Sequence, residues 1–236
     1  MMIDRSLGYG RHIVHDYLKK SLPFNSVLDI GAGNGRDLLM ARGVNRNAEL
    51  HAIEYSDSYI ANLKKHDINI YQIDIEKERL PFADESMDIV IANQILEHVK
   101  EIFWIFNEIS RVLTVGGRLI IGVPNLASLH NRLLLLIGCQ PTSIQLYSAH
   151  IRGFTISGFD KFLSYCWKGG YERIQAKGSN FYPFPPILAR PLADFFPSLA
   201  WGIFMLSKKS RQYNDEFLKY PLENSLETNF FLGKDW

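Results

Sequence analysis

The sequence predicts an α/β protein built on a doubly wound parallel sheet. Short apolar runs alternate with segments of helical periodicity from residue 26 to residue 123, and this alternation is typical of such a sheet. The run 87–92 (Met-Asp-Ile-Val-Ile-Ala) is almost entirely apolar, which favours a strand buried on both faces. A length of 236 residues suits one large domain, or one domain with a small appendage.

The first half of the chain supplies four expected strands and three helices. The strands are expected over 26–30, 49–54, 69–73 and 87–92, and the helices over 5–20, 34–43 and 58–66. The apolar residues of 5–20 fall on one stripe, and Pro23 marks the end of that helix. Ser56 and Asp57 are placed to cap the helix that follows the second strand.

The second half begins with the clearest helical period, over 100–113, which Gly116-Gly117 ends. The remaining elements are a strand over 118–123, helices over 126–137 and 157–167, strands over 171–178 and 200–207, and a short helix in the proline-rich stretch 180–198. Residues 125–156 interrupt the alternation after the fifth strand, above the edge where ligands bind. We interpret them as a lid or substrate wall within a domain over 1–208, with a tail over 209–236 that packs on the domain or on a partner.

The composition bears on partners and compartment. Lys and Arg total 26 against 25 Asp and Glu, so there is no basic footprint and nucleic acid is not expected as a partner. Cys139 and Cys166 form no C-x-x-C pair, and no clustered acids and histidines suggest a metal site, so none is predicted. The longest aliphatic run, 133–137, is far below the roughly 20 residues of a membrane span. With no apolar signal core at the N-terminus, a cytoplasmic protein is expected.

Three strand ends carry polar residues that fit a nucleoside. The first strand runs into Gly31, Gly33 and Gly35, which allow a tight turn and a close approach of the backbone to a ligand. Glu54 closes the second apolar run and Asp74 the third. A carboxylate such as Glu54 suits two vicinal ribose hydroxyls. Two alternatives stay open: a turn used for packing alone, and a nicotinamide dinucleotide site, whose G-x-G-x-x-G pattern would need glycine in place of Arg36.

Together these segments resemble the class I S-adenosylmethionine-dependent methyltransferases of the type 11 small-molecule group. The matching motifs are Val27–Gly35, Glu54, Gln72–Glu76, Leu80–Val90, Leu96–Val99, Arg111–Leu113 and Gly116-Gly117. The resemblance is strong over about 25–125 and weaker to about 208. It implies a Rossmann-like, seven-stranded, mostly parallel sheet whose last strand is antiparallel, and S-adenosyl-L-methionine as the cofactor.

The resemblance also implies which residues hold the cofactor. Asp29 accepts from its ammonium, directly or through water, and Glu54 binds the ribose. Asp74 with the Ile75 amide binds the adenine, while Asn93 and Gln94 lie near the sulfonium. The full implied set is Asp29, Gly31, Ala32, Gly33, Asn34, Gly35, Glu54, Tyr55, Asp74, Ile75, Asn93 and Gln94. Tyr9 and Arg11, ahead of the first strand, are expected to fold over the cofactor.

The acceptor side is less determined by the sequence. His98 and His150 are the candidate catalytic residues, because a histidine suits removal of a hydroxyl proton; the alternatives are a structural hydrogen bond for His98 and a lid contact for His150. Arg152 is the candidate substrate contact for a carboxylate or phosphate, or else pairs with a lid acid. Residues 150–155 resemble an element of type 11 enzymes in polysaccharide and lipid biosynthesis.

We therefore expect a methyltransferase that acts on a small-molecule, lipid-linked or saccharide-linked acceptor, at oxygen rather than nitrogen or carbon. The alternatives are a non-catalytic S-adenosylmethionine-binding regulatory or partner protein, and an NAD(P)-dependent oxidoreductase. The leucine-rich helix over 126–137 and the Phe/Pro-rich stretch 181–197 are expected to pack over the pocket or to touch a membrane surface. The oligomeric state is not predicted.

Overall fold

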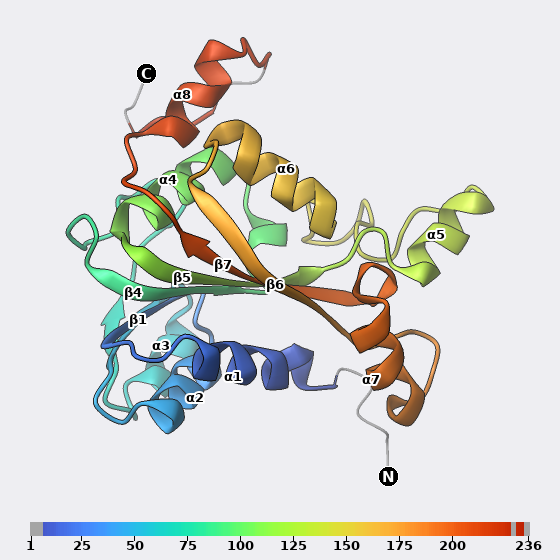
Figure 1. Cartoon of the computed structure of the whole chain (residues 1–236), viewed down its shortest axis with the longest axis horizontal. Helices are drawn as coiled ribbons and strands as arrows, with labels where there is room; N and C mark the ends of the chain where they lie inside the picture. The colour runs from blue at the N-terminus through green and yellow to red at the C-terminus, as the bar shows by residue number, and fades with distance from the viewer. Residues whose placement is uncertain (1–6, 228–229, 234–236) are drawn as a thin grey trace.

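A computed structural model describes residues 7–227 and 230–233 of the chain. A single seven-stranded sheet runs through its centre, with helices on both faces (Figure 1). The strands are β1 (Ser26–Ile30), β2 (Glu49–Ile53), β3 (Asn69–Tyr71), β4 (Met87–Asn93), β5 (Leu113–Pro124), β6 (Tyr171–Ser179) and β7 (Gly202–Lys209). The longer helices are α1 (Arg11–Lys20), α2 (Arg36–Val44), α3 (Asp57–Leu63), α4 (Ile102–Val112), α5 (Leu129–Leu136), α6 (Ile156–Cys166), α7 (Pro186–Phe195) and α8 (Glu216–Glu223). Three short 3-10 helices are η1 (Leu7–Gly10), η2 (Leu96–His98) and η3 (Pro197–Leu199).

The strand order is β3-β2-β1-β4-β5-β7-β6. Strand β1 pairs in parallel with β2 on one side and β4 on the other, and β4 continues in parallel to β5. Strand β7 lies between β5 and β6 and is antiparallel to both. The predicted doubly wound sheet with an antiparallel last strand is therefore confirmed. Because parallel strands end on one edge, β1, β2 and β4 deliver the residues that follow them to the same place.

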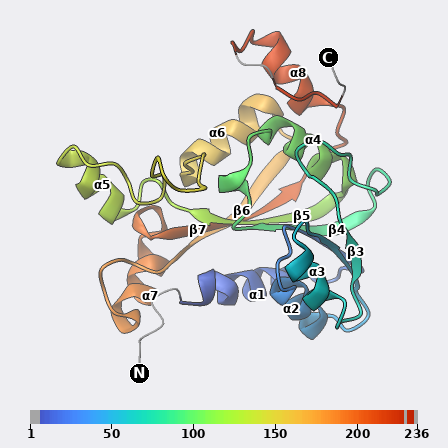
Figure 2. The same cartoon turned by 180° about the vertical axis from the view of Figure 1, so that it is seen from behind.

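The two faces of the sheet bury separate apolar layers (Figures 1 and 2). Helices α1, α2 and α3 cover one face, where Tyr17 and Leu38 are fully buried. Helices α4 and α6 cover the other face, with Phe106 at the centre of an aromatic cluster. Because both faces of the sheet are covered, a central strand such as β4 carries apolar residues on both of its sides.

Several element ends shift by a few residues from the predicted ranges, and three differences change the interpretation of the fold. Strand β3 ends at Tyr71, so Asp74 lies in the loop beyond it, and β5 begins at Leu113 rather than at 118. The predicted tail contains α8, whose Phe217 is fully buried against Phe106, with 5.4 Å between ring centroids. The described part of 209–236 thus packs on the domain, because its few apolar side chains complete the core over α4. Residues 5 and 6 of the first expected helix lie outside the described residues.

One buried ion pair holds the loop between β3 and β4 against α4. The guanidinium of Arg111 lies 2.6 Å from Glu108 Oε2 and also donates to the carbonyl oxygens of Leu80 and Phe82. Glu108 Oε2 in turn accepts from the backbone N–H of Leu80. Both side chains are nearly inaccessible to solvent, so these contacts fix the segment that leads from Asp74 into β4.

We expect Arg111→Met to lower the free energy of unfolding by about 3–5 kcal/mol, because it leaves the Glu108 carboxylate buried without its partner. Urea unfolding monitored by circular dichroism measures this change. Arg79→Met is the matched control, since Arg79 pairs with Asp84 at 3.5 Å on the surface, and it should cost less than about 1 kcal/mol. Equal losses in the two variants would contradict the role given to Arg111.

Candidate functional site

The turn after β1 forms the floor of the site. Gly31 has φ +73°, and a Cβ at this position would lie 2.9 Å from the Ile95 side chain, so only glycine fits without a shift. Gly33 has φ +52° and faces open space. The backbone N–H groups of Gly31 and Ala32 donate to Ile53 O, which ties the turn to β2. The turn therefore presents bare backbone beside the end of the second strand.

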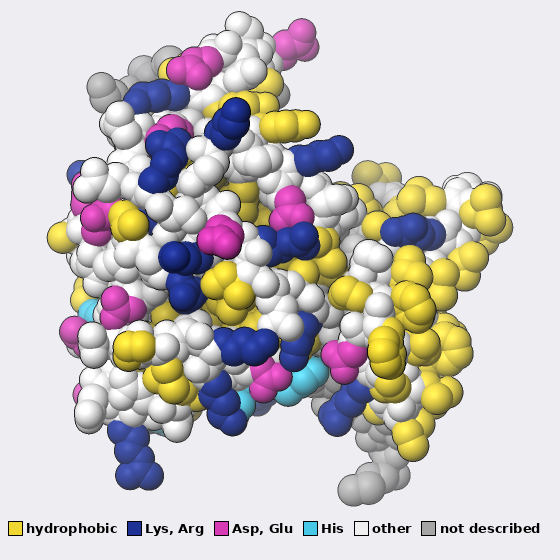
Figure 3. Space-filling view, in the orientation of Figure 1, with side chains coloured by type: hydrophobic (Ala, Val, Ile, Leu, Met, Phe, Trp, Pro, Cys, Tyr) yellow, Lys and Arg dark blue, Asp and Glu magenta, His cyan; other side chains and the backbone are white. Residues whose placement is uncertain are grey.

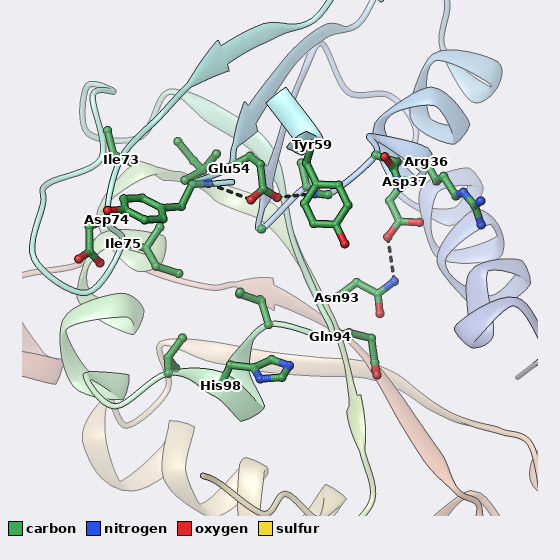
Figure 4. A pocket seen from close by; sticks show the side chains of 18 of the residues that line it. Arg36, Asp37, Glu54, Tyr59, Ile73, Asp74, Ile75, Asn93, Gln94 and His98 are labelled. Atoms are coloured by element: carbon green, nitrogen blue, oxygen red, sulfur yellow. Dashed lines mark hydrogen bonds between the residues drawn. The ribbon is translucent and has the colours of Figure 1, made fainter. Parts of the chain in front are cut away.

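Glu54 lies directly after β2 and is 9% exposed. Its Oε1 accepts from the N–H groups of Tyr55 and Ser56, both at 2.9 Å, and its Oε2 accepts from Gly33 N–H at 2.7 Å (Figure 4). A carboxylate has about four acceptor positions, so about one is left. A grip on two hydroxyls requires that one of them replace a backbone donor.

A cavity of about 750 Å³ opens above this turn. Of the residues predicted to hold a cofactor, those that line it are Gly31, Ala32, Gly33, Asn34, Glu54, Tyr55, Asp74, Ile75, Asn93 and Gln94. They come from the ends of β1, β2 and β4 and from the loop after β3, as predicted. The structure therefore brings most of the predicted set to one place.

Two predicted residues do not line the cavity. Asp29 is the last but one residue of β1 and only 2% exposed, and its burial, with Asp37 nearby, raises the pKa of its carboxyl well above the usual range. A direct contact of Asp29 with an ammonium group is not supported by this geometry, and a contact through water stays a prediction. Gly35 faces α3, where a Cβ would lie 2.6 Å from Leu63, so it serves helix packing.

Asp37 is an acid of this cavity that the sequence analysis missed. It lies in the first turn of α2 and is 5% exposed. Its Oδ1 lies 3.2 Å from the guanidinium of Arg11, and its Oδ2 accepts from Asn93 Nδ2 at 2.8 Å (Figure 4). Among the described residues, Asn93 Oδ1 is buried and has no hydrogen-bond partner. The sequence signal that could have identified Asp37 is its position two residues after Gly35, the last glycine of the turn.

Other lining residues lay outside the set predicted to hold the cofactor, among them the candidate catalytic residue His98. They are Arg36, Ile53, Tyr59, Ile73, Glu76, Ile95, His98 and Val99. Tyr59 stands on α3 with its ring beside the turn (Figure 4). Arg11 lines the cavity, as expected of it, while the side chain of Tyr9 lies outside the described residues.

A second cavity of about 780 Å³ adjoins the first. Both cavities are lined by Arg11, Asn93, Gln94 and His98. The remaining walls of the second cavity are Glu97, Pro124, Thr142, Ser143, His150, Ser179, Asn180, Tyr182, Trp201, Gly202 and Phe204. Its lining therefore comes mainly from the end of β4, η2, the insertion after β5, the end of β6 and the start of β7.

The two candidate catalytic histidines meet in the second cavity. The ring centroids of His98 and His150 are 4.7 Å apart, and the rings are nearly perpendicular. The carboxylate of Glu97 joins them, with one ligand atom of each residue within 4.8 Å of the others. The expectation that no acids and histidines cluster is therefore wrong for these three residues. The cluster could not be predicted from residue spacing, because His150 lies in the insertion after β5, far along the chain from Glu97 and His98.

Burial shifts the protonation of this cluster. It raises the pKa of the Glu97 carboxyl to about 7. It also lowers the pKa of His98, and the neighbouring His150 lowers it further. Glu97 Oε2 has no hydrogen-bond partner among the described residues.

Arg152 has a different place from the one predicted. Its Nε donates to Val99 O at 3.0 Å and its Nη2 donates to Lys100 O. The N–H groups of Ile151 and Arg152 both donate to Glu97 O. Arg152 lines neither of the two cavities. It holds the end of the insertion against η2, and thereby keeps His150 beside His98.

Comparisons with known proteins bear on this site. Residues 28–121 match the family model described as a methyltransferase domain. An uncharacterized 37.1 kDa protein in a Streptomyces fradiae transposon is 32% identical over 111 residues, which are 45% of this chain and 32% of that protein. A probable S-adenosylmethionine-dependent methyltransferase of Mycobacterium tuberculosis is 26% identical over 118 residues, which are 50% of this chain and 42% of that protein. The match thus spans less than half the length of these relatives.

Solved structures share the fold at low sequence identity. A possible histamine N-methyltransferase from Thermotoga maritima has a TM-score of 0.59 at 17% identity. The match covers 87% of this chain and 91% of that chain. The plantazolicin methyltransferase BpumL, in complex with a triazolic desmethylPZN analog and SAH, has a TM-score of 0.60 at 18% identity. The match covers 88% of this chain and 86% of that chain. The predicted family resemblance and its cofactor, S-adenosylmethionine, are confirmed by these comparisons together.

The first cavity fits this cofactor in two respects. Asn93 Oδ1 is a buried acceptor without a hydrogen-bond partner among the described residues, which suits a cationic group. Gly35 at the start of α2 provides no side-chain cap for the helix, so the N–H groups of the first turn are available to a carboxylate. Asp74, the predicted adenine contact, lies at the far end of the cavity from Asn93, which is predicted to lie near the sulfonium (Figure 4).

We expect Glu54→Ala to weaken S-adenosylhomocysteine binding by about 10- to 100-fold, since a carboxylate contributes about 1.5–3 kcal/mol through each hydrogen bond to it. Isothermal titration measures the affinity. Glu49→Ala is the control, because Glu49 starts the same strand with an exposed side chain, and it should bind as the native protein does. Unchanged affinity in Glu54→Ala would contradict the ribose assignment.

Proposed function

We propose that this chain, which carries a class I S-adenosylmethionine-dependent methyltransferase domain of the type 11 group, transfers a methyl group to an acceptor bound in the second cavity. The observation that carries the proposal is the common wall of the two cavities at the end of β4. When bound, the cofactor supplies a methyl group already activated by its sulfonium. The protein has to align the acceptor, exclude water and accept or direct a proton.

The residues of the common wall support a cofactor in the first cavity and an acceptor in the second. Asn93 is the last residue of β4 and Gln94 follows it. Gln94 takes a positive φ of 58°, and its N–H donates to Gly122 O at 2.7 Å. These contacts fix the backbone at the point where both cavities meet. A methyl group at this point would face the second cavity, and an acceptor there would be in line with it.

Oxygen is the proposed methylated atom. His98 and His150 present ring nitrogens to the second cavity, and the Glu97 carboxylate lies beside them. Groups that accept hydrogen bonds suit a hydroxyl, which must lose its proton when it is methylated. We therefore propose that the acceptor hydroxyl lies against this cluster, with His98 and His150 as the groups that activate it.

A lipid-linked acceptor and contact with a membrane surface are a further part of the proposal. Figure 3 shows hydrophobic side chains gathered over α5 and α7. We call this the apolar surface; its exposed residues are Leu133, Leu135, Leu136, Ile137, Ile187, Leu188, Phe195 and Phe196. It lies next to the second cavity, because His130 of α5 contacts Tyr182 and Trp201 of the cavity wall. In the part of the chain that the structure describes, no helix has the length and apolar character to cross a bilayer, so contact would be peripheral.

His98→Ala and His150→Ala should each lower turnover by about 100-fold or more, in the range of a lost acid–base group, while S-adenosylhomocysteine still binds to both. Release of S-adenosylhomocysteine in a screen of hydroxylated small molecules, lipids and saccharides measures turnover. His66→Ala, on the exposed surface, is the control. Cofactor binding without turnover on any acceptor would instead favour a binding protein without catalytic activity.

The double variant Leu136→Asp/Ile187→Asp should bind phosphatidylcholine–phosphatidylglycerol vesicles at least about ten-fold more weakly than the native chain, since both side chains are 82% exposed and would enter the lipid. Co-sedimentation measures the bound fraction. Val115→Asp alters an exposed apolar residue away from this surface, on β5, and should leave binding unchanged. No sedimentation of the native chain would contradict membrane contact.

A further inference from the structure

Three atoms of the kind that bind metal ions face the second cavity together. Glu97 and His98 belong to η2 after β4, and His150 lies near the end of the insertion that follows β5. One carboxylate oxygen and one nitrogen of each ring lie within 4.8 Å of one another. Glu97 and His150 do not line the cofactor cavity, so cofactor binding does not explain why they are brought together.

The backbone fixes which nitrogen of each ring carries the proton. His98 Nδ1 lies 3.2 Å from Ala149 O, and His150 Nδ1 lies 3.0 Å from Ser143 O. A carbonyl oxygen only accepts, so each Nδ1 is the donor and each neutral ring keeps a free electron pair on Nε2. Metal-binding histidines commonly donate their other ring nitrogen to a carbonyl in this way, which sets the ring's tautomer and orientation.

The carbonyl that orients His150 is itself held in place. The side chain of Asn131 is 1% exposed, and its Nδ2 donates to Ser143 Oγ at 2.9 Å and to Asn125 O at 3.0 Å. Asn131 Oδ1 accepts from both the backbone N–H and the hydroxyl of Thr142 at 3.1 Å. This buried amide joins the start of the insertion to residues 142 and 143, of which Ser143 contacts His150. The segment that orients His150 is therefore held by hydrogen bonds.

Glu97 provides the third ligand and a reason for a cation. Its side chain is 1% exposed, and Oε2 has no hydrogen-bond partner among the described residues. A buried carboxylate oxygen without a partner is costly unless a charge or donor meets it. No salt bridge to Glu97 occurs within 7–227 and 230–233 either, so a positive charge from outside the chain would satisfy the group.

We propose that Glu97, His98 and His150 bind one divalent transition-metal ion at the wall of the second cavity. Two imidazoles and one carboxylate suit ions such as Mn²⁺, Fe²⁺, Co²⁺ or Zn²⁺, whereas Mg²⁺ and Ca²⁺ prefer oxygen alone. Three protein ligands leave positions open for an oxygen from a further molecule, as in catalytic metal sites.

The ion gives the cluster its chemical role, and this step rests on the proposed function. An acceptor hydroxyl bound to the ion has a lowered pKa and releases its proton to solvent water. The oxygen of that group then forms the new bond to the methyl carbon as the bond from the methyl carbon to sulfur breaks. His98 and His150 thus act on the hydroxyl through the ion, which also orients the oxygen toward the common wall.

Titration of the chelator-treated full chain with Co²⁺ tests the site, with heat and visible absorption as readouts. We expect one ion per chain at micromolar affinity, with absorption bands of a nitrogen- and oxygen-ligated ion. His150→Ala and the isosteric Glu97→Gln should each weaken binding by at least about ten-fold. His66→Ala removes a histidine elsewhere on the surface and should bind as the native chain does. Mg²⁺ should not compete.

The outcomes separate this proposal from the proposed function. Weak Co²⁺ binding that is equal in the native chain, His150→Ala and Glu97→Gln would overturn the metal site, while S-adenosylhomocysteine binding in the same samples would leave the methyltransferase proposal standing. Loss of Co²⁺ binding in the two variants supports the metal site even when no acceptor has been found. Thermal unfolding shows whether each variant is folded. Bound Co²⁺ should raise the Tm of the native chain and should leave the Tm of a folded His150→Ala variant unchanged.

Discussion

Parallel pairing of β1 with β2 and β4 is the constraint on which the rest of the site depends. It brings the glycine turn, Glu54 and Asn93 to one edge, although they are far apart in the sequence. Because β4 pairs in turn with β5, the insertion that follows β5 emerges at the same edge. The cofactor cavity and the second cavity are therefore neighbours as a consequence of strand order, and Asn93 and His98 belong to both.

The second cavity depends on a smaller set of polar contacts. Arg152 and Ile151 fasten the end of the insertion to η2 through the carbonyl oxygens of residues 97, 99 and 100. Asn131 fastens the middle of the insertion to its own start. These contacts explain why a segment without a strand of the central sheet can still hold His150 at a defined place. Through these contacts Ser143 and His150 of the insertion line the second cavity, and its role as a lid or substrate wall stays a prediction.

The sequence predicted the sheet and most of the cofactor edge because both follow from local patterns. A glycine turn after an apolar run, and an acid after the next run, can be recognised in the sequence itself. Gly31 and Glu54, found in this way, both line the first cavity. What local patterns could not predict depended on the path of the chain in space. Asp29 was assigned to the ligand from its place at a strand end, yet it is buried and does not line the cavity, and Arg152 contacts backbone carbonyl oxygens. The meeting of His98 with His150 had no local signal, because only the return of the insertion creates it.

The central claim is that the cofactor binds in the first cavity with its reactive end at the wall shared with the second. A crystal structure of the full chain with S-adenosylhomocysteine tests it most directly. The account predicts the ribose at Glu54, the adenine near Asp74 and Ile75, and the sulfur beside Asn93 and Gln94, facing His98. A sulfur that points away from the second cavity, or a ligand bound outside the first cavity, would contradict the account.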